Sequence, residues 1–210
     1  MKTLLIIATA GLMGFNSYKK DDNESNNVSA VSINTQEKLD LCFLREEEKL
    51  AHDVYVYAYN KYGVMIFNNI SASEASHMSS VLNLLNKYSI IDPVNSNGPG
   101  VFVDTNLQQL YNDLILQVDV SLIKALEVGA TIEDLDISDI NTFYRNTSKS
   151  DLIQVYDALT CGSRNHIKAF TSQLTSQGVT YIPQYLTQST YDSILALPHE
   201  QCGNGMRFRK

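Results

Sequence analysis

The feature that most constrains this chain is a glutamate and a histidine, Glu74 and His77, which stand three residues apart in an apolar periodic segment, residues 67–88. At about 100° per residue, both side chains fall on the same line along a helix as Ile70 and Val81. They therefore belong to the face of the helix that packs into the core. Burying an ionised carboxylate without a partner is costly, so this pair needs an opposing charge, a metal ion or a hydrogen-bonded network.

The composition describes an acidic chain that is rich in helix-forming residues. Its 210 residues are 44% hydrophobic, which is enough for one domain with a sizeable core. The formal net charge of -7 provides no basic surface for phosphate groups and argues against nucleic-acid binding. Glycine and proline are scarce, with 10 and 4 residues, so the chain is expected to be all-α.

Residues 1–20 have the pattern of a signal peptide, because Lys2 precedes an apolar run that is too short to span a membrane. The sequence therefore predicts export to the periplasm or cell envelope of a Gram-negative bacterium. The segment that follows the run resembles a lipoprotein signal, but Tyr18 stands where the lipidated cysteine would be and cannot carry the lipid. An ordinary secretory signal and an uncleaved anchor both stay open. Residues 21–34, rich in Asn and Ser, are expected to form a flexible linker.

The part of the chain that folds is predicted to be residues 35–185, followed by a C-terminal extension, residues 186–210, with a short helical segment. Apolar spacing, capping residues and glycine stops predict four long core helices and one shorter helix before the third of them. In chain order the five helices are expected at residues 35–62, 67–88, 106–117, 121–143 and 150–177. Four long helices joined by short connections favour an antiparallel four-helix bundle.

Each of the four core helices carries an acidic or imidazole group on its inward face. The second helix contributes the pair described above, and the first, third and last contribute Glu48, Glu133 and His166. A single inward histidine is more often a core residue than a ligand, but five such groups on four faces match the arrangement of ferritin-like carboxylate bundles. The two glutamates before Glu48, Glu46 and Glu47, point away from this face and are predicted to be solvated.

Four segments together resemble the uncharacterised bacterial and archaeal family DUF2202, which is ferritin-like. They are REEEKLAHDVY from Arg45 to Tyr55, SEASH from Ser73 to His77, GATIEDLDI from Gly129 to Ile137, and GSRNH from Gly162 to His166. The spacing of Glu48, Ala51 and Tyr55 is also similar to the first helix of rubrerythrins. The resemblance covers residues 36–185. It implies a ferritin-like bundle, whose characterised relatives hold two iron or manganese ions and use them with dioxygen or peroxide.

The chain departs from the general ferritin-like pattern at Ser163, where a further glutamate would precede the last histidine by three residues. Three carboxylates and two histidines remain, a donor set that suits iron, manganese or zinc. Two iron ions are expected, while a single ion or a bundle without metal stays open. Asp136 is a candidate acceptor for a histidine N–H or a simple helix-end charge, and Tyr55 either bonds a ligand carboxylate or packs in the core.

The first functional hypothesis is an exported metal protein in which Glu48, Glu74 and His77 hold one ion and Glu133 and His166 hold the second, with Glu74 bridging. Its chemistry would be Fe(II) oxidation, or reduction of peroxide or dioxygen, as in an oxidoreductase of the di-iron oxidase or peroxidase type. No CxxC pair is present, so electrons would come from an external donor. The protein would work alone or as a homodimer.

The second hypothesis is a metal-free helical binding or structural module of the cell envelope. In it the inward charges would pair with one another. Zinc-dependent hydrolysis is a third class that the ligand types allow, although no further motif supports it.

The three cysteines, Cys42, Cys161 and Cys202, have no metal-binding spacing. Two of them can pair in an exported protein, and the sequence does not select which. His199 near Cys202 is a weak metal-binding signal, because both residues are expected in a mobile tail.

Overall fold

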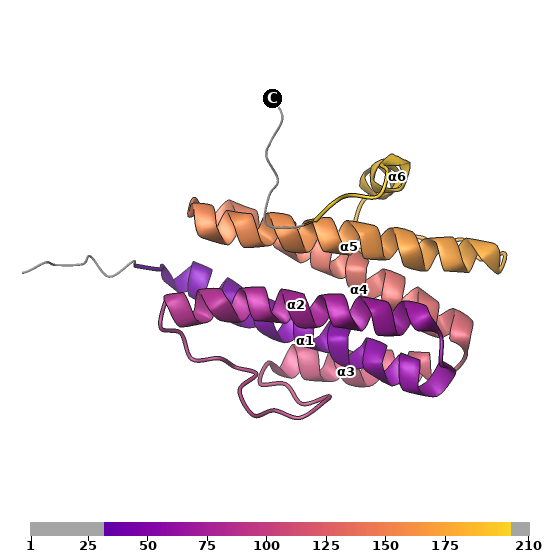
Figure 1. The fold of residues 1–210 in the computed structure, drawn as a ribbon, viewed down its shortest axis with the longest axis horizontal. Helices are drawn as coiled ribbons and strands as arrows, with labels where there is room; N and C mark the ends of the chain where they lie inside the picture. The colour runs from indigo at the N-terminus through magenta and orange to yellow at the C-terminus, as the bar shows by residue number, and fades with distance from the viewer. Residues whose placement is uncertain (1–31, 203–210) are drawn as a thin grey trace, which may run out of the picture. The chain divides into compact units, whose positions relative to one another are not determined.

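The computed structural model describes residues 32–202, which form six α-helices and no β-strand (Figure 1). The helices are α1 (Thr35–Tyr62), α2 (Met65–Lys87), α3 (Thr105–Val118), α4 (Leu122–Phe143), α5 (Ser150–Ser176) and α6 (Gln188–Ala196). The all-α prediction is confirmed, and the predicted helix ends lie within a few residues of those observed. The predicted signal peptide, most of the predicted linker and residues 203–210 lie outside the described residues.

No helix in the described range has both the length and the apolar character that a membrane span requires.

The ends of α1 show why the chain begins and ends a helix where it does. Asn34 and Glu37 form a capping box, in which each side chain accepts a hydrogen bond from the other residue's backbone N–H at 2.8 and 2.9 Å. At the other end Gly63 takes a left-handed conformation with φ 67°, which favours glycine, and donates to the carbonyl of Tyr59. The helix is therefore fixed at both ends by local sequence.

Two helical hairpins make up the bundle. A two-residue turn after α1 returns the chain along it as α2, and a 3₁₀ turn, Tyr144–Asn146, lies between α4 and α5. The closest packing is within these hairpins, and contacts of α1 with α4 and of α2 with α5 join them. The shorter α3 packs against α1 and α4, and α6 packs on α5 (Figure 1).

The apolar core consists of two clusters, and charged residues interrupt it. Along α1, Leu44 belongs to one cluster and Ala51 to the other, and Glu48 lies between them. Along α2, Ile70 and Val81 belong to different clusters in the same way, with the glutamate and histidine of that helix between them. A band of buried charge therefore crosses the middle of the bundle.

The prediction that Glu46 and Glu47 are solvated is wrong, because they are only 3% and 1% exposed. The connection between α2 and α3 covers Glu46, whereas Glu47 faces Asp139 of α4. Glu46 accepts hydrogen bonds from the backbone N–H groups of Val103 and Asp104, the latter at 3.0 Å. Helical periodicity identifies one buried face of a helix and cannot detect further positions that a loop or a neighbouring helix covers.

The same connection is held by other charged residues of α1. Arg45 forms two hydrogen bonds with the Asp92 carboxylate at 3.1 and 3.0 Å, and Lys49 donates to the carbonyl of Gly98 at 2.8 Å. Bidentate Arg–carboxylate pairs fix geometry as well as charge. The polar side of α1 therefore anchors a long loop, while its opposite side contributes to the centre of the bundle.

Candidate metal centre

The structure brings together all five residues that the sequence singled out, each from the helix expected. Glu48 comes from α1, Glu74 and His77 from α2, Glu133 from α4 and His166 from α5. Glu74 and Glu133 are completely buried, Glu48 is 1% exposed, and each histidine is 9% exposed. The four helices thus place three carboxylates and two imidazoles in one buried cluster.

The cluster consists of two groups that share Glu74. In the first, His77 Nδ1 lies 2.7 Å from Glu74 Oε2 and 3.1 Å from Glu48 Oε2. In the second, His166 Nδ1 lies 2.8 Å from Glu74 Oε1 and 3.3 Å from Glu133 Oε2. Within each group the candidate ligand atoms all lie within 4.8 Å of one another. The two oxygens of Glu74 therefore face different groups.

Most of these atoms approach one another without the geometry of a hydrogen bond. Both oxygens of Glu74, one oxygen each of Glu48 and Glu133, and Nδ1 of His166 are buried and have no hydrogen-bonding partner. Buried polar atoms are nearly always paired, so such atoms need an explanation. His77 Nδ1 and Glu48 Oε2 do form a hydrogen bond at 3.1 Å. The unpaired donor atoms that gather around this bond fit a cation with the oxygen and imidazole ligands that transition metals accept.

The electrostatics show how the cluster is neutralised when no metal is bound. Burial lowers the pKa of His166, but Glu133 and Glu74 outweigh this effect and raise it to about 10. Burial also raises the pKa of Glu48 to about 8, although His77 opposes the rise. Burial acts in the same direction on Glu74, but there His77 and His166 outweigh it and hold the pKa below its usual range. Without metal, protons on the histidines and on a glutamate compensate the buried carboxylates.

Tyr55 lies directly beside the cluster. Its hydroxyl donates to Glu133 Oε1 at 2.6 Å and lies 3.3 Å from the carbonyl oxygen of Gly129, while its ring packs against Phe170. Both alternatives considered for this residue therefore apply at once. The bond leaves Glu133 Oε2 free to face His166.

Ser163 is fully buried, and its hydroxyl donates to the carbonyl of Leu159 in its own helix at 3.2 Å. A serine that bonds within its helix adds no charge to the cluster. The set of three carboxylates and two histidines is therefore all that these helix positions supply.

Asp136 is buried inside α4, and neither of its oxygens accepts a hydrogen bond from any described residue, so neither alternative, an acceptor for a histidine N–H or a helix-end charge, is found. Its neighbours include Glu47, and burial raises the pKa of both carboxyl groups well above the usual range. The charge of Glu47 adds to the rise at Asp136, whereas the charges of Asp139 and Glu48 add to the rise at Glu47. Glu47 was missed because its helical phase differs from that of Glu48. The two form an acidic extension of the cluster.

Gly162 is a further site residue that the periodicity did not identify. A Cβ atom built at this position would lie 2.6 Å from both Cε1 and Nε2 of His77, so the imidazole packs directly on the glycine backbone. A glycine inside a helix costs stability, which was the available signal that another group approaches closely. The absence of a side chain here leaves room for the ring of His77.

Comparison with known proteins identifies relatives of unknown function. The family described as "Uncharacterized protein domain (DUF2202)" matches residues 37–198. The uncharacterized protein MJ0754 of Methanocaldococcus jannaschii is 45% identical over 169 residues, which are 80% of this chain and 91% of that protein. The crystal structure of hypothetical protein MJ0754 from Methanococcus jannaschii is similar with a TM-score of 0.79 and covers 80% of this chain and 97% of that chain.

Proposed function

The chain belongs to the DUF2202 family of uncharacterised proteins, and we propose that it is a ferritin-like protein whose helical bundle holds two divalent metal ions for redox chemistry. The proposal rests on the buried cluster and on the ligand chemistry of its residues, since the relatives carry no stated activity. Glu48, Glu74 and His77 would hold one ion, and Glu133 and His166 would hold the second, with Glu74 bridging.

The observation that carries this proposal is the position of Glu74. Each of its oxygens faces a different histidine, at 2.7 and 2.8 Å, and neither oxygen has a hydrogen-bonding partner. A carboxylate buried for structural reasons is normally satisfied by donors. A carboxylate that bridges two cations is left in this state when the cations are absent.

The donor set favours iron, and manganese or zinc are alternatives with the same ligand types. Bound iron would supply the electrons for reduction of dioxygen or a peroxide. The chain's own residues would bind the ions and position the ligands. Tyr55 fixes one oxygen of Glu133, and Gly162 leaves room for the His77 ring. Three carboxylates do not neutralise the four positive charges of two divalent ions, so a hydroxide or an exogenous anion would balance the remaining positive charge.

We place this activity outside the cytoplasm, in the periplasm or cell envelope, with an external electron donor and a monomer or homodimer as the working unit. The proposal of export rests on residues 1–20, whose sequence has the pattern of a signal peptide. The disulfide between Cys161 and Cys202 is compatible with this location.

A second candidate is a metal-free structural module of the envelope, which one observation favours. His77 and His166 have raised pKa values, so as imidazolium ions they can pair with Glu74, Glu48 and Glu133 without any metal. In this account the cluster is a buried salt-bridge network. Such networks often contribute little net stability and serve to specify one arrangement of the helices.

Metal content separates the two candidates. The full chain is loaded anaerobically with Fe(II), freed of excess iron, and its metal is counted by elemental mass spectrometry, beside the variants Glu48→Ala and Glu46→Ala. These two glutamates lie on the same helix and are similarly buried, but Glu46 bonds backbone N–H groups and belongs to neither group.

We expect about two irons per chain in the wild type and in Glu46→Ala, and at most one in Glu48→Ala, because removing one ligand opens one of the two sites. Background metal in the wild type, with both variants merely less stable, would exclude the metal centre and leave the structural module.

A further inference from the structure

The proposed metal centre has an opening to solvent that a short C-terminal segment borders. A cavity of about 430 Å³ lies between α2 and α5, and His77 and His166 form part of its wall. Three residues of the segment 198–202 line it as well, namely His199, Glu200 and Cys202. We call residues 198–202 the strap. A small molecule that reaches the two histidines through this cavity passes the strap.

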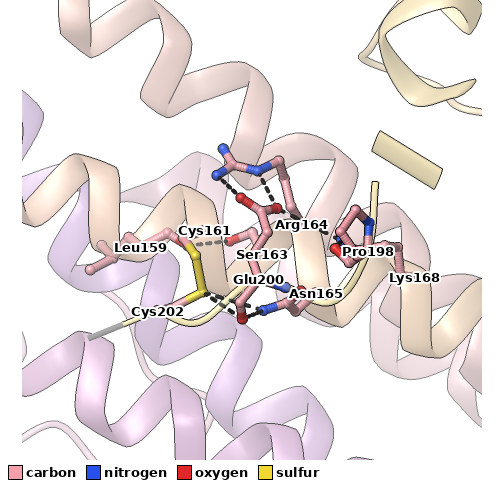
Figure 2. The surroundings of a disulfide bond; sticks show 9 residues. All are labelled: Leu159, Cys161, Ser163, Arg164, Asn165, Lys168, Pro198, Glu200 and Cys202. Atoms are coloured by element: carbon pink, nitrogen blue, oxygen red, sulfur yellow. Dashed lines mark hydrogen bonds and ion pairs between the residues drawn. A yellow bond between two sulfur atoms is a disulfide. The ribbon is translucent and has the colours of Figure 1, made fainter. Parts of the chain in front are cut away.

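Figure 2 shows how the strap is fastened to α5. Arg164 donates two hydrogen bonds to the Glu200 carboxylate at 2.8 and 2.6 Å. Asn165 exchanges hydrogen bonds with the backbone of Glu200 at 2.8 and 3.0 Å, and Lys168 donates to the carbonyl of Pro198 at 2.9 Å. His199 and Cys202, which were expected in a mobile tail, thus lie in a segment that is bonded to α5.

A disulfide between Cys161 of α5 and Cys202 of the strap completes these contacts (Figure 2). Its two ends differ in exposure, because Cys161 is fully buried and Cys202 is exposed. Cys161 also directly precedes Gly162, on whose backbone the His77 ring packs. The disulfide thus links the solvent-exposed rim of the cavity to the helix segment that contacts a proposed ligand.

The disulfide joins the strap to α5 and does not link two of the ligand-bearing helices to each other. All the helices that supply the proposed ligands end before the strap, and the strap already has an ion pair and several hydrogen bonds. Exposed disulfides are more readily reduced than buried structural ones, and thiol–disulfide exchange begins by attack on an accessible sulfur. Cys202 offers such a sulfur, with Cys161 as the leaving group.

We propose that Cys161 and Cys202 form a redox-active pair that passes electrons from an external thiol donor to a peroxide held in the cavity at the metal centre. This inference rests on the proposed function, because the metal ions are the site at which the peroxide is reduced. It gives the external donor a specific entry point at Cys202.

The reaction balances with a peroxide as oxidant. The two thiols give up two electrons and two protons, one S–S bond forms, the O–O bond of one hydrogen peroxide breaks, and two waters leave. An external dithiol then reduces the S–S bond by exchange at Cys202 and becomes a disulfide itself. The structure described here corresponds to the oxidised state of the pair.

The test uses the full chain and counts its thiols. The protein is reduced with a dithiol, loaded with Fe(II) without oxygen, and desalted, and its iron content is measured. One equivalent of hydrogen peroxide is added, the remaining thiols are alkylated, and intact mass spectrometry counts the adducts. Cys42 is an internal control, because it is a free, partly buried cysteine whose thiol pKa burial raises.

We expect three adducts per chain before peroxide and one after it, with Cys42 as the residue that stays alkylated. Protein without metal and the iron-deficient Glu48→Ala variant should keep three adducts over the same interval. The Cys202→Ser variant should keep its two adducts and retain oxidised iron, whereas Cys42→Ser should fall from two adducts to none.

Each other outcome has a distinct meaning. Oxidised iron with three adducts retained would make the disulfide a structural link and overturn this inference while the proposed function stands. Equal thiol loss with and without iron would show direct thiol oxidation and would also overturn it. A wild type that binds no iron would overturn the proposed function and, with it, this inference.

Discussion

The substitution Gly162→Ala should disturb only one of the two proposed ions, the one that His77 would hold. The new Cβ would lie 2.6 Å from His77 Cε1 and Nε2, and ordinary contact begins at 3.4 Å, so the ring must retreat by about 0.8 Å. A preorganised site tolerates displacements of only about 0.5 Å. The same Cβ would lie 3.7 Å from His166 Cε1, an ordinary contact, so the second histidine need not move.

We therefore expect Gly162→Ala to weaken the ion held by Glu48, Glu74 and His77 by about 10- to 100-fold, the range found when the support of a ligand is disturbed. The ion at His166 should stay, and iron content should fall from about two to about one per chain at limiting free iron. The assay is competition with a chromogenic iron chelator under anaerobic conditions.

Gly129→Ala is the matched control for this variant. Its Cβ would lie 2.5 Å from a ring carbon of Phe170, so it overfills the core to a similar degree without meeting the His77 ring, and Phe170 packs on Tyr55 beside the second ion. Overpacking costs about 1–3 kcal/mol, partly offset in both variants by the better helix propensity of alanine, about 1 kcal/mol. Urea unfolding of the metal-free proteins measures this effect.

Two results would refute this reasoning. Wild-type iron binding in a folded Gly162→Ala protein would show that His77 does not ligate the first ion. Loss of the ion at His77 in Gly129→Ala as well would show that affinity depends on general core packing and not on the position of the ring.

Three further predictions follow from the buried charges. Tyr55→Phe removes a bond to the buried Glu133 carboxylate and should lower the stability of the metal-free protein in urea by about 1–3 kcal/mol, and an unchanged midpoint would contradict that bond. Metal binding near pH 7 should release protons from His77 and His166, because their raised pKa values keep both side chains charged in the metal-free state. Metal affinity should therefore rise with pH. An indicator dye that detects no proton release on metal binding would exclude imidazole ligation. Asp136→Asn should stabilise the metal-free protein by about 1–3 kcal/mol at pH 7. A carboxyl whose pKa is raised by folding makes the folded protein less stable as pH rises above the pKa of that carboxyl in the unfolded chain. The stability of the variant should therefore depend less on pH between pH 4 and 7, and an unchanged slope would contradict this reasoning.

The fold and the centre of the site could be predicted because both depend on helical periodicity. Glu48, Glu74 and Glu133 lie in phase with the apolar residues of their own helices, and phase alone is enough to place them inside a bundle. The order of the helices and their capping residues is likewise local information. The residues that meet at the centre of the bundle then follow from the inward faces of the four core helices.

The features that escaped prediction depend on contacts between distant segments. Glu47 is buried on a side of α1 that is out of phase with its apolar face. The pairing of Cys161 with Cys202 and the anchoring of Glu200 by Arg164 join α5 to residues more than thirty positions away. The contact of Gly162 with the His77 ring needs the packing of α2 on α5. None of these has a periodic signal.

The division of the core into two apolar clusters decides how metal and folding are coupled. One cluster contains Val54, Phe67 and Phe170, the other contains Leu41 and Tyr156, and every one of these side chains is at most 1% exposed. Because each cluster draws on several of the four core helices, the bundle is held on both sides of the charged band whether or not a cation is present. Metal should therefore bind to a folded protein and add stability as RT ln(1 + [L]/Kd), about 2.7 kcal/mol at a hundredfold excess over Kd. Circular dichroism of chelator-treated protein checks this, since native helix content with a lowered midpoint is expected. A chain that lost its helices with its metal would show that the cation, and not the flanking clusters, holds the bundle together.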